Sequence, residues 1–153
     1  MSPLRAIWGA DAQNIFAVGD SGVILRYDGK SWTGGAQSAA NGRTLRGVWG
    51  SSASNVWAVG DGGTAMHYDG QTWSLQNTGT KNALNGVWSA SAGSAWVVGD
   101  SGTALHWDGS KFVSETSGTS SHLNSVWGSA EGNLVAVGDT GTIVQRNGMT
   151  WST

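Results

Sequence analysis

The chain has 153 residues, enough for one domain, and it is rich in glycine (25) and tryptophan (10), whereas only 12% of its residues are charged. A formal net charge of −2, without a cluster of Lys or Arg, argues against a nucleic-acid-binding surface. No apolar run approaches the roughly 18 residues that a membrane-spanning helix needs. The chain has no Cys, which excludes disulfides and thiol chemistry.

Taken in order, the chain repeats one unit four times. Each unit starts with a short strand of the pattern Leu-x-x-(Val/Ile)-Trp, predicted at 4–8, 45–49, 84–88 and 123–127. A polar connection rich in Gly, Ser and Asn leads to a second strand of four consecutive apolar residues, predicted at 15–18, 56–59, 95–98 and 134–137. An unbroken apolar run predicts a strand that is covered on both faces.

A Gly-Asp-x-Gly turn follows each second strand, and its first glycine stands at positions 19, 60, 99 and 138, so the units are 39 to 41 residues long. We expect glycine to supply the positive φ that such a turn needs. A third strand then leads to an Asp-Gly or Asn-Gly turn, which is a strong hairpin signal. The fourth strand carries an aromatic residue, which is Trp32, Trp73, Phe112 or Trp151.

Two hairpin turns per unit predict a four-stranded antiparallel meander of the size of one propeller blade. A β-trefoil needs three such units rather than four, and the coils of a β-solenoid are shorter and lack the hairpins. The sequence therefore predicts an all-β fold, a β-propeller with four blades per chain. The single domain covers 1–153, and its blades lie approximately at 4–44, 45–83, 84–122 and 123–153.

The repeated pattern Leu-x-x-Val-Trp, Trp-Ala-Val-Gly-Asp-x-Gly-Thr and His-Tyr-Asp-Gly-x-x-Trp resembles the blades of Asp-box (BNR-like) propellers. It is most similar to those of the photosystem II stability/assembly-factor-like family and of repeat-rich bacterial proteins. A shortened Asp box stands at 28–32 and 69–73, with weaker copies at 108–112 and 147–151. The resemblance covers residues 4–151 and implies blade structure. In that family the box is a structural turn remote from the binding face, so it implies no particular activity.

Four blades in an open stack would expose two broad apolar faces, so the array is expected to close. It could close as a four-bladed ring in one chain, or as an eight-bladed ring of two chains. Small residues such as Gly47, Gly86 and Ala58 favour thin, closely spaced blades, whereas the outer aromatic residues favour the splayed blades of a smaller ring. The chain begins on a first strand and ends on a fourth, so junctions between chains would resemble junctions within one. We favour the eight-bladed homodimer, with the four-bladed monomer as the alternative.

The candidate ligand-binding residues are the aspartates of the four Gly-Asp turns and one tryptophan. In a propeller these turns share a face with the links between blades, where carboxylates could coordinate Ca²⁺ or hydrogen-bond sugar hydroxyls. The alternative, which we favour, is that each aspartate holds its own turn. The tryptophan is a candidate because it replaces a tyrosine of two other units, and an exposed indole stacks on sugars. These residues are Asp20, Asp61, Asp100, Asp139 and Trp107.

A second candidate set follows the leading Leu of each first strand and could line the mouth of the central channel. In a dimer it would place four arginines near the axis, as an anion site needs, although we favour solvated side chains in a wet channel. The set consists of Arg5, Arg46, Asn85 and Asn124. His67 and His106 occupy matching positions on separate blades, about 10 Å apart, which is too far for a shared metal ion. We predict no metal site and no cofactor, and we assign the recurring tryptophans and these histidines mainly to blade packing.

No catalytic constellation is visible in the sequence, which predicts a protein that is not an enzyme. The predicted function is a binding or scaffolding module whose partners are a second copy of itself and a glycan or protein ligand, with no nucleic acid or membrane partner. The alternatives are a lectin with one glycan site per blade, and a half-propeller cut from a longer repeat chain or prepared to study propeller assembly. Residues 1–4 lack the pattern of a signal peptide, so we expect either a cytoplasmic protein or a piece of an exported one.

Overall fold

The computed structural model describes residues 2–37 and 40–153. Over these residues, sixteen β-strands form four separate antiparallel sheets of four strands, and the strands of each sheet are neighbours in chain order. This arrangement confirms the predicted propeller architecture of four four-stranded blades. None of the described elements is a helix with the length and apolar character needed to cross a membrane.

Each blade runs from an innermost to an outermost strand. The first blade has β1 (Leu4–Asp11), β2 (Asn14–Gly19), β3 (Val23–Tyr27) and β4 (Trp32–Ala36). The second has β5 (Leu45–Ser52), β6 (Asn55–Gly60), β7 (Thr64–Tyr68) and β8 (Trp73–Gln76). The third has β9 (Leu84–Ser91), β10 (Ser94–Gly99), β11 (Thr103–Trp107) and β12 (Phe112–Thr116), and the fourth has β13 (Leu123–Ala130), β14 (Asn133–Gly138), β15 (Ile143–Asn147) and β16 (Thr150–Ser152).

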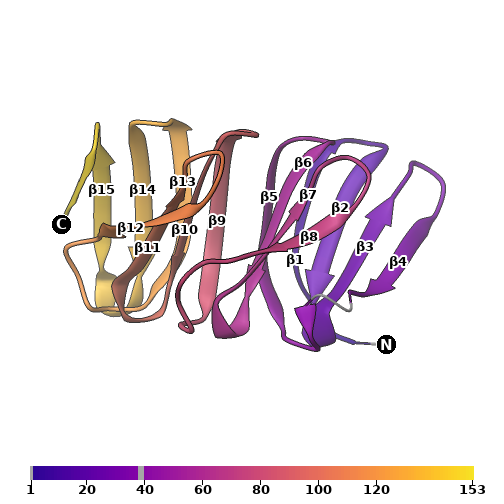
Figure 1. Ribbon diagram of the computed structural model, residues 1–153, viewed down its shortest axis with the longest axis horizontal. Helices are drawn as coiled ribbons and strands as arrows, with labels where there is room; N and C mark the ends of the chain where they lie inside the picture. Colours follow the sequence, from indigo (N-terminus) through magenta and orange to yellow (C-terminus); the bar gives the residue numbers. More distant parts are fainter. Residues whose placement is uncertain (1, 38–39) are drawn as a thin grey trace.

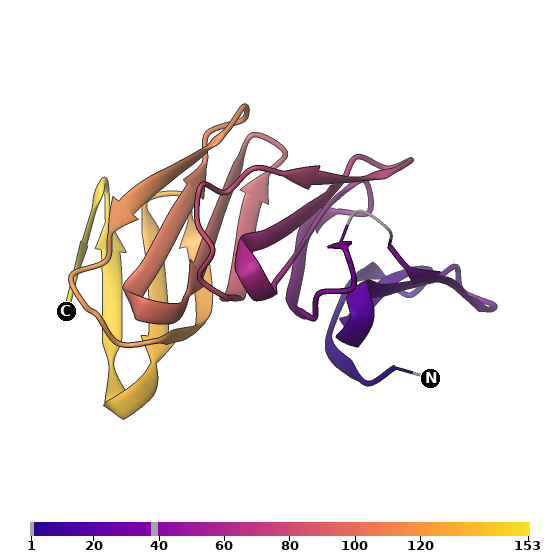
Figure 2. The same ribbon diagram turned by 60° about the horizontal axis from the view of Figure 1, so that its bottom comes forward.

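The blades stand in a row that is open at both ends. The inner strands β1, β5, β9 and β13 are neighbours in that order, and the first and fourth blades lie at opposite ends of the molecule (Figure 1 and Figure 2). Apolar side chains on the outward faces of these two blades are accessible to solvent, with Ile7 66% and Trp127 57% exposed. The single chain is therefore an open arc, and the closed four-bladed ring that was the alternative from the sequence is not the arrangement of this structure.

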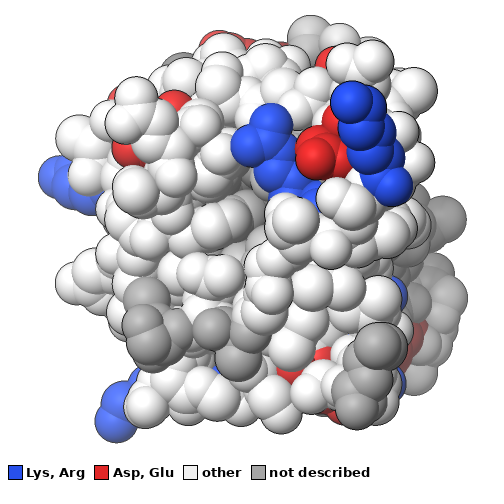
Figure 3. All heavy atoms as spheres, turned by 90° about the vertical axis from the view of Figure 1, so that its right-hand side faces the viewer, with Lys and Arg blue, Asp and Glu red and all other residues white. Residues whose placement is uncertain are grey.

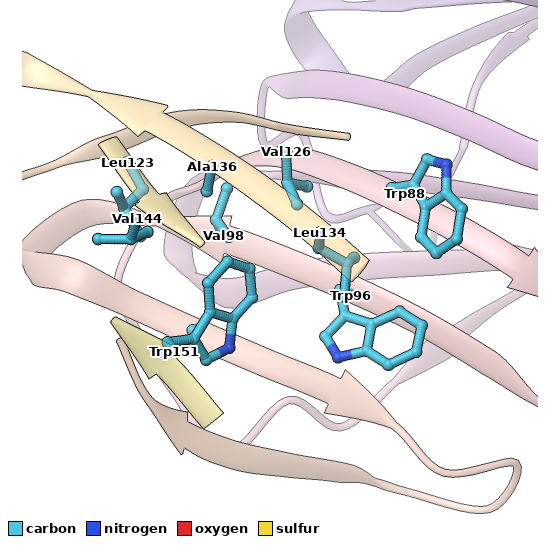
Figure 4. Packing of buried hydrophobic residues seen from close by; sticks show 10 residues of the cluster. Trp88, Trp96, Val98, Leu123, Val126, Leu134, Ala136, Val144 and Trp151 are labelled. Atoms are coloured by element: carbon cyan, nitrogen blue, oxygen red, sulfur yellow. The ribbon is translucent and has the colours of Figure 1, made fainter. Parts of the chain in front are cut away.

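The hydrophobic core is divided among the three interfaces between consecutive blades. At the last of them, Trp88, Trp96 and Val98 of the third blade pack against apolar side chains of the fourth (Figure 4). The second strands of the two middle blades, β6 and β10, are buried along their whole length, as their unbroken apolar runs predict. Burial of apolar surface contributes about 25 cal/mol per Å². Because this buried surface lies between consecutive blades, each blade is held mainly by its neighbours.

The inner strands approach one another closely. A Cβ atom on Gly47 would stand 3.0 Å from the carbonyl oxygen of Asn85, and one on Gly86 would stand 2.9 Å from the Cα of Ser125. Backbone atoms of the next blade therefore leave little room for side chains at these two positions, which explains the small residues in the first strands.

Candidate functional site

Each Gly-Asp turn is tied to the start of its own blade. In the second blade, the N–H of Asp61 donates to the carbonyl of Thr44 at 2.9 Å. The preceding residue, Gly60, is extended with φ −174°, and a Cβ atom there would lie 2.0 Å from the same carbonyl oxygen. The positive φ values fall on the two residues that follow Asp61, Gly62 and Gly63. The second glycine of the turn therefore supplies the expected positive φ, whereas the first glycine is required by close backbone contact.

A β-bulge at the start of each inner strand turns one polar side chain towards this turn. The register between β5 and β6 shifts between Leu45 and Gly47, and Arg46 lies between them as the extra residue. The other three blades have the same shift at the equivalent place. The extra residues of the four bulges are the predicted channel-mouth residues.

The structure brings the two predicted sets together, one pair in each blade. The pairs are Arg5–Asp20 (2.8 Å), Arg46–Asp61 (2.5 Å), Asn85–Asp100 (2.9 Å) and Asn124–Asp139 (2.7 Å). The bond from Arg5 lowers the pKa of Asp20 below its ordinary value. His122, in the link before the fourth blade, places its Nδ1 atom 3.1 Å from a carboxylate oxygen of Asp100. Each aspartate is therefore engaged by its own blade or link.

The structure does not gather these carboxylates into a metal site. Over the part of the chain that is described, no group of three or more His, Cys, Asp or Glu side chains could hold a metal ion. The arginines of the channel mouth are likewise paired with aspartates, so an anion would have to compete with Asp20 and Asp61 for them. A ligand at these turns would therefore meet partly exposed Arg–Asp and Asn–Asp pairs that already share short hydrogen bonds.

Trp107 is buried, which contradicts its assignment as a ligand-binding residue. Only 8% of its surface is exposed, and its ring lies 5.2 Å from the rings of Trp57 and Phe112, measured between centroids. Trp57 belongs to the second blade and covers Trp107 from across the interface. Trp107 is therefore a core residue of that interface.

The two third-strand histidines pack on tryptophans of the second strands of their own blades. His67 stacks on Trp57 and His106 stacks on Trp96, each with 4.3 Å between ring centroids. The Nε2 atom of His67 lies 2.6 Å from the side-chain oxygen of Asn55. Burial lowers the pKa of both histidines below the ordinary value. Their assignment to packing agrees with these contacts.

The Asp-Gly turns lie at the far ends of the third strands from the Gly-Asp turns. In the third blade, the Asp108 carboxylate accepts hydrogen bonds from the N–H groups of Ser110 and Lys111, both at 2.9 Å, while Gly109 has φ +96°. These bonds, with that from Lys111 the strongest, lower the pKa of Asp108 to about 2. The first two blades repeat the pattern. The shortened Asp box therefore acts as a structural turn here, as the resemblance implied.

A hollow of about 280 Å³ lies where the inner strands of the arc meet, and all four of them contribute to it. Small residues such as Gly47 and Gly86 line it together with the larger side chains of Arg46, Asn85 and Trp127. Each inner strand is the terminal strand of its sheet. The hollow therefore combines exposed side chains with strand edges whose backbone groups have no strand partner within the described sheets.

Two further hollows lie beside the Gly-Asp turns of the second and third blades, and both border the link that joins these blades. The first, of about 310 Å³, is lined by Gly62–Thr64, Leu75 and the link that follows β8. The second, of about 480 Å³, is lined by Ser101–Leu105, Phe112 and the same link. Both offer hydroxyl and amide groups beside apolar side chains.

No family model matches this chain, and no curated protein matches it. Among solved structures, YCF48 bound to D1 peptide is similar with a TM-score of 0.74 and 17% identity, over 99% of this chain and 53% of that chain. YCF48 from Cyanidioschyzon merolae is similar with a TM-score of 0.75 and 14% identity, over 94% of this chain and 50% of that chain. The fold is that of the YCF48 propeller. The resemblance to photosystem II assembly-factor-like propellers is thus confirmed for the fold, and this chain spans about half the length of both YCF48 chains.

Proposed function

We propose that this chain is a non-enzymatic propeller module that binds a segment of another protein on the concave surface of its inner strands. The observation that carries the proposal is the hollow lined by Arg46 and Asn85 beside the edges of β5 and β9. An extended peptide pairs with the backbone of an exposed strand edge and gains specificity from neighbouring side chains. Both kinds of group are available at this hollow.

Two further observations support this reading. The solved YCF48 structure with a bound D1 peptide supports a protein segment as the class of ligand. Among the described residues, those that line the hollow include one hydroxyl, that of Ser125, but no acid, histidine or cysteine, so no side chain of the lining could activate it as a general base. Binding without chemistry is therefore the use that the surface favours.

Capture of fluorescently labelled chain on an array of unstructured synthetic peptides tests the proposal. We expect a subset of peptides to be captured, and we expect Arg46→Ala and Asn85→Ala each to weaken that capture by about tenfold, the effect of losing one hydrogen bond to a charged or amide group. Lys81→Ala, an exposed residue outside the hollow, is the matched control. Capture of no peptide, or equal capture by the three variants, would overturn the proposal.

A lectin with one shallow site per blade is the second candidate, and the hollows beside the Gly-Asp turns of the second and third blades favour it. Phe112 and Leu75, rather than Trp107, would supply the apolar contact to a sugar ring, and Thr80 and Asn82 would supply polar contacts. A glycan array distinguishes the candidates, because a lectin binds defined glycans and loses them in Phe112→Ala. A folded chain that binds no glycan excludes this candidate.

The assembly that we propose for either module is a homodimer that closes an eight-bladed ring. A half-propeller taken from a longer repeat chain is the third candidate, and further blades of that chain would then cover both end faces. The mass of the chain in solution separates these two, because only the homodimer has twice the mass of the 15.8 kDa chain.

A further inference from the structure

Each blade contacts its neighbours through two different apolar faces. The forward face packs on the next blade along the chain, and in the first blade it consists of Trp8, Phe16, Val18 and Ile24. The backward face packs on the preceding blade, and in the second blade it consists of Leu45, Val48, Val56, Ala58 and Met66. The other two interfaces join equivalent residues. All three interfaces in the chain therefore pair a forward face with a backward face.

Among the described residues, no other blade packs on the backward face of the first blade. Ile7, at the position of Val48, is 66% exposed, whereas Val48 is 7% exposed. Leu4 is 49% exposed, although its equivalents in the other three blades are fully buried. Figure 3 looks onto this end of the molecule, and uncharged residues occupy most of the middle of the view. The backward face of the first blade therefore exposes apolar side chains that the other blades bury against a neighbour.

The forward face of the fourth blade is also uncovered. Trp127 is 57% exposed, whereas Trp88 at the same position of the third blade is 6% exposed. Val137 and Ile143 are exposed as well, while the residues that correspond to them in the third blade, Val98 and Ala104, are buried. The two ends of the arc thus present one unpaired face of each kind.

The shapes of the two free faces match at a tryptophan and a glycine. At the first interface Trp8 lies over Gly50, where an added Cβ atom would come within 2.6 Å of the indole, and at the last interface Trp88 lies over Gly128 in the same way, at 3.0 Å. The corresponding residues of the free faces are Trp127 and Gly9. Gly9 is exposed, and the three atoms nearest to a Cβ atom there belong to its own blade. The place for one more indole is therefore open.

The polar groups at the edge of these faces match too. Asn85 donates one hydrogen bond to Asp100 in its own blade and another to the carbonyl of Leu123 in the next blade. Asn124 makes the equivalent bond within its blade, to Asp139. The carbonyl that would complete the pattern for Asn124 is that of Leu4, on the free face of a first blade.

We infer that the forward face of the fourth blade binds the backward face of the first blade of a second copy, with Trp127 over Gly9 and Asn124 bonded to the carbonyl of Leu4. Two copies form two such junctions, related by a two-fold axis, and close the ring at eight blades. In the YCF48 structures a propeller contains about twice the length of this chain, and a second copy would supply that missing half. The inference rests on the proposed homodimer and does not depend on what the concave surface binds.

Light scattering after size exclusion, over a dilution series, tests the inference. We expect twice the 15.8 kDa mass for the unmodified chain and the single-chain mass for Ile7→Lys and for Trp127→Glu. Both side chains are exposed in the single chain, so circular dichroism should show that the variants fold. Val113→Glu replaces an exposed apolar residue of an outer strand and should leave the mass doubled.

Mixing the two monomeric variants identifies the pairing of the faces. A dimer of one Ile7→Lys copy and one Trp127→Glu copy has one intact junction and one in which Lys faces Glu, so the doubled mass should return. A dimer that paired two identical faces would survive one of the two substitutions unchanged, which would overturn the inference. A single-chain mass for the unmodified protein, as expected of a piece of a longer propeller, or a mass that grows without limit would also overturn it. Peptide capture is measured separately, so its failure would leave this result intact.

Discussion

The Arg146 guanidinium pairs with the Glu115 carboxylate across the interface of the third and fourth blades, with its Nε and Nη2 atoms both 2.9 Å from carboxylate oxygens. Arg146 is buried, and Glu115 also accepts a hydrogen bond from the indole of Trp151. The equivalents of Arg146 in the other blades are Tyr27, Tyr68 and Trp107. The interface of the third and fourth blades therefore has an ion pair where the other interfaces have an aromatic contact. In the sequence, an arginine at a position that is aromatic in the other three units was the signal for a buried acidic partner.

Removal of Glu115 should be strongly destabilising. Glu115→Ala leaves a buried guanidinium without its counter-charge, and such a loss costs about 3–5 kcal/mol in the free energy of unfolding. Glu115→Leu combined with Arg146→Met should recover most of the loss, because no charge is then buried. Urea denaturation followed by tryptophan fluorescence measures both. Glu131→Ala removes an exposed carboxylate and serves as the control, and equal effects of the two alanine variants would contradict the prediction.

Gly60 should not accept a side chain. A Cβ atom would stand 2.0 Å from the carbonyl oxygen of Thr44, so Gly60→Ala must displace backbone and should cost at least about 1–3 kcal/mol. Gly93 has nothing within 4 Å of an added Cβ atom, and Gly93→Ala should change stability by less than about 0.5 kcal/mol. Thermal denaturation of the two variants provides the measurement. A Gly60→Ala variant as stable as Gly93→Ala would show that the turn relaxes.

Acid should weaken the third blade through Asp108. The folded pKa of Asp108 is about 2 and its ordinary value is 3.8, because backbone N–H groups stabilise the carboxylate. The stabilisation is therefore complete above about pH 4 and is lost as the pH falls through about 2. Asp108→Asn, which copies Asn147 of the fourth blade, should flatten the fall of the urea midpoint between pH 4 and pH 2. Parallel pH profiles for the two proteins would contradict this assignment.

Protonation of His106 should also reduce the stability of the fold, in a pH range above that of Asp108. Burial against Trp96 lowers its folded pKa below the ordinary value of 6.5, so the native state favours the neutral imidazole. Stability is then greatest above about pH 6.5 and falls as the pH drops towards the folded pKa. His106→Gln, which copies Gln145 of the fourth blade, should remove part of the fall between pH 7 and pH 5. An NMR titration of the imidazole, with a midpoint at or above 6.5, would show that the prediction is wrong.

The strands and turns were predictable because their signals are local. Four consecutive apolar residues at 56–59 indicate a strand covered on both sides, and Asp69-Gly70 indicates a hairpin whatever surrounds it. The structure places β6 and the turn after β7 accordingly. A repeat strengthens such signals, because four copies carry the same pattern.

The contacts of the candidate site were not predictable in the same way. Asp20 and Arg5 were both identified as recurring polar positions, but their pairing depends on the bulge between β1 and β2, which the apolar pattern does not encode. Trp107 was misjudged because a tryptophan on the third strand looks the same whether it is exposed or covered. Its burial is decided by Trp57, which lies in another blade.

The sequence by itself determined the repeated unit, its hairpins and the apolar character of both of its faces. The tertiary structure decided which faces remain uncovered and where the arc ends. Val48 and Ile7 occupy the same position of the repeat, yet one is 7% and the other 66% exposed. The physical reason is that the local pattern makes a face apolar, whereas its burial depends on a neighbouring blade some forty residues away, and within this structure the two end faces have no such neighbour.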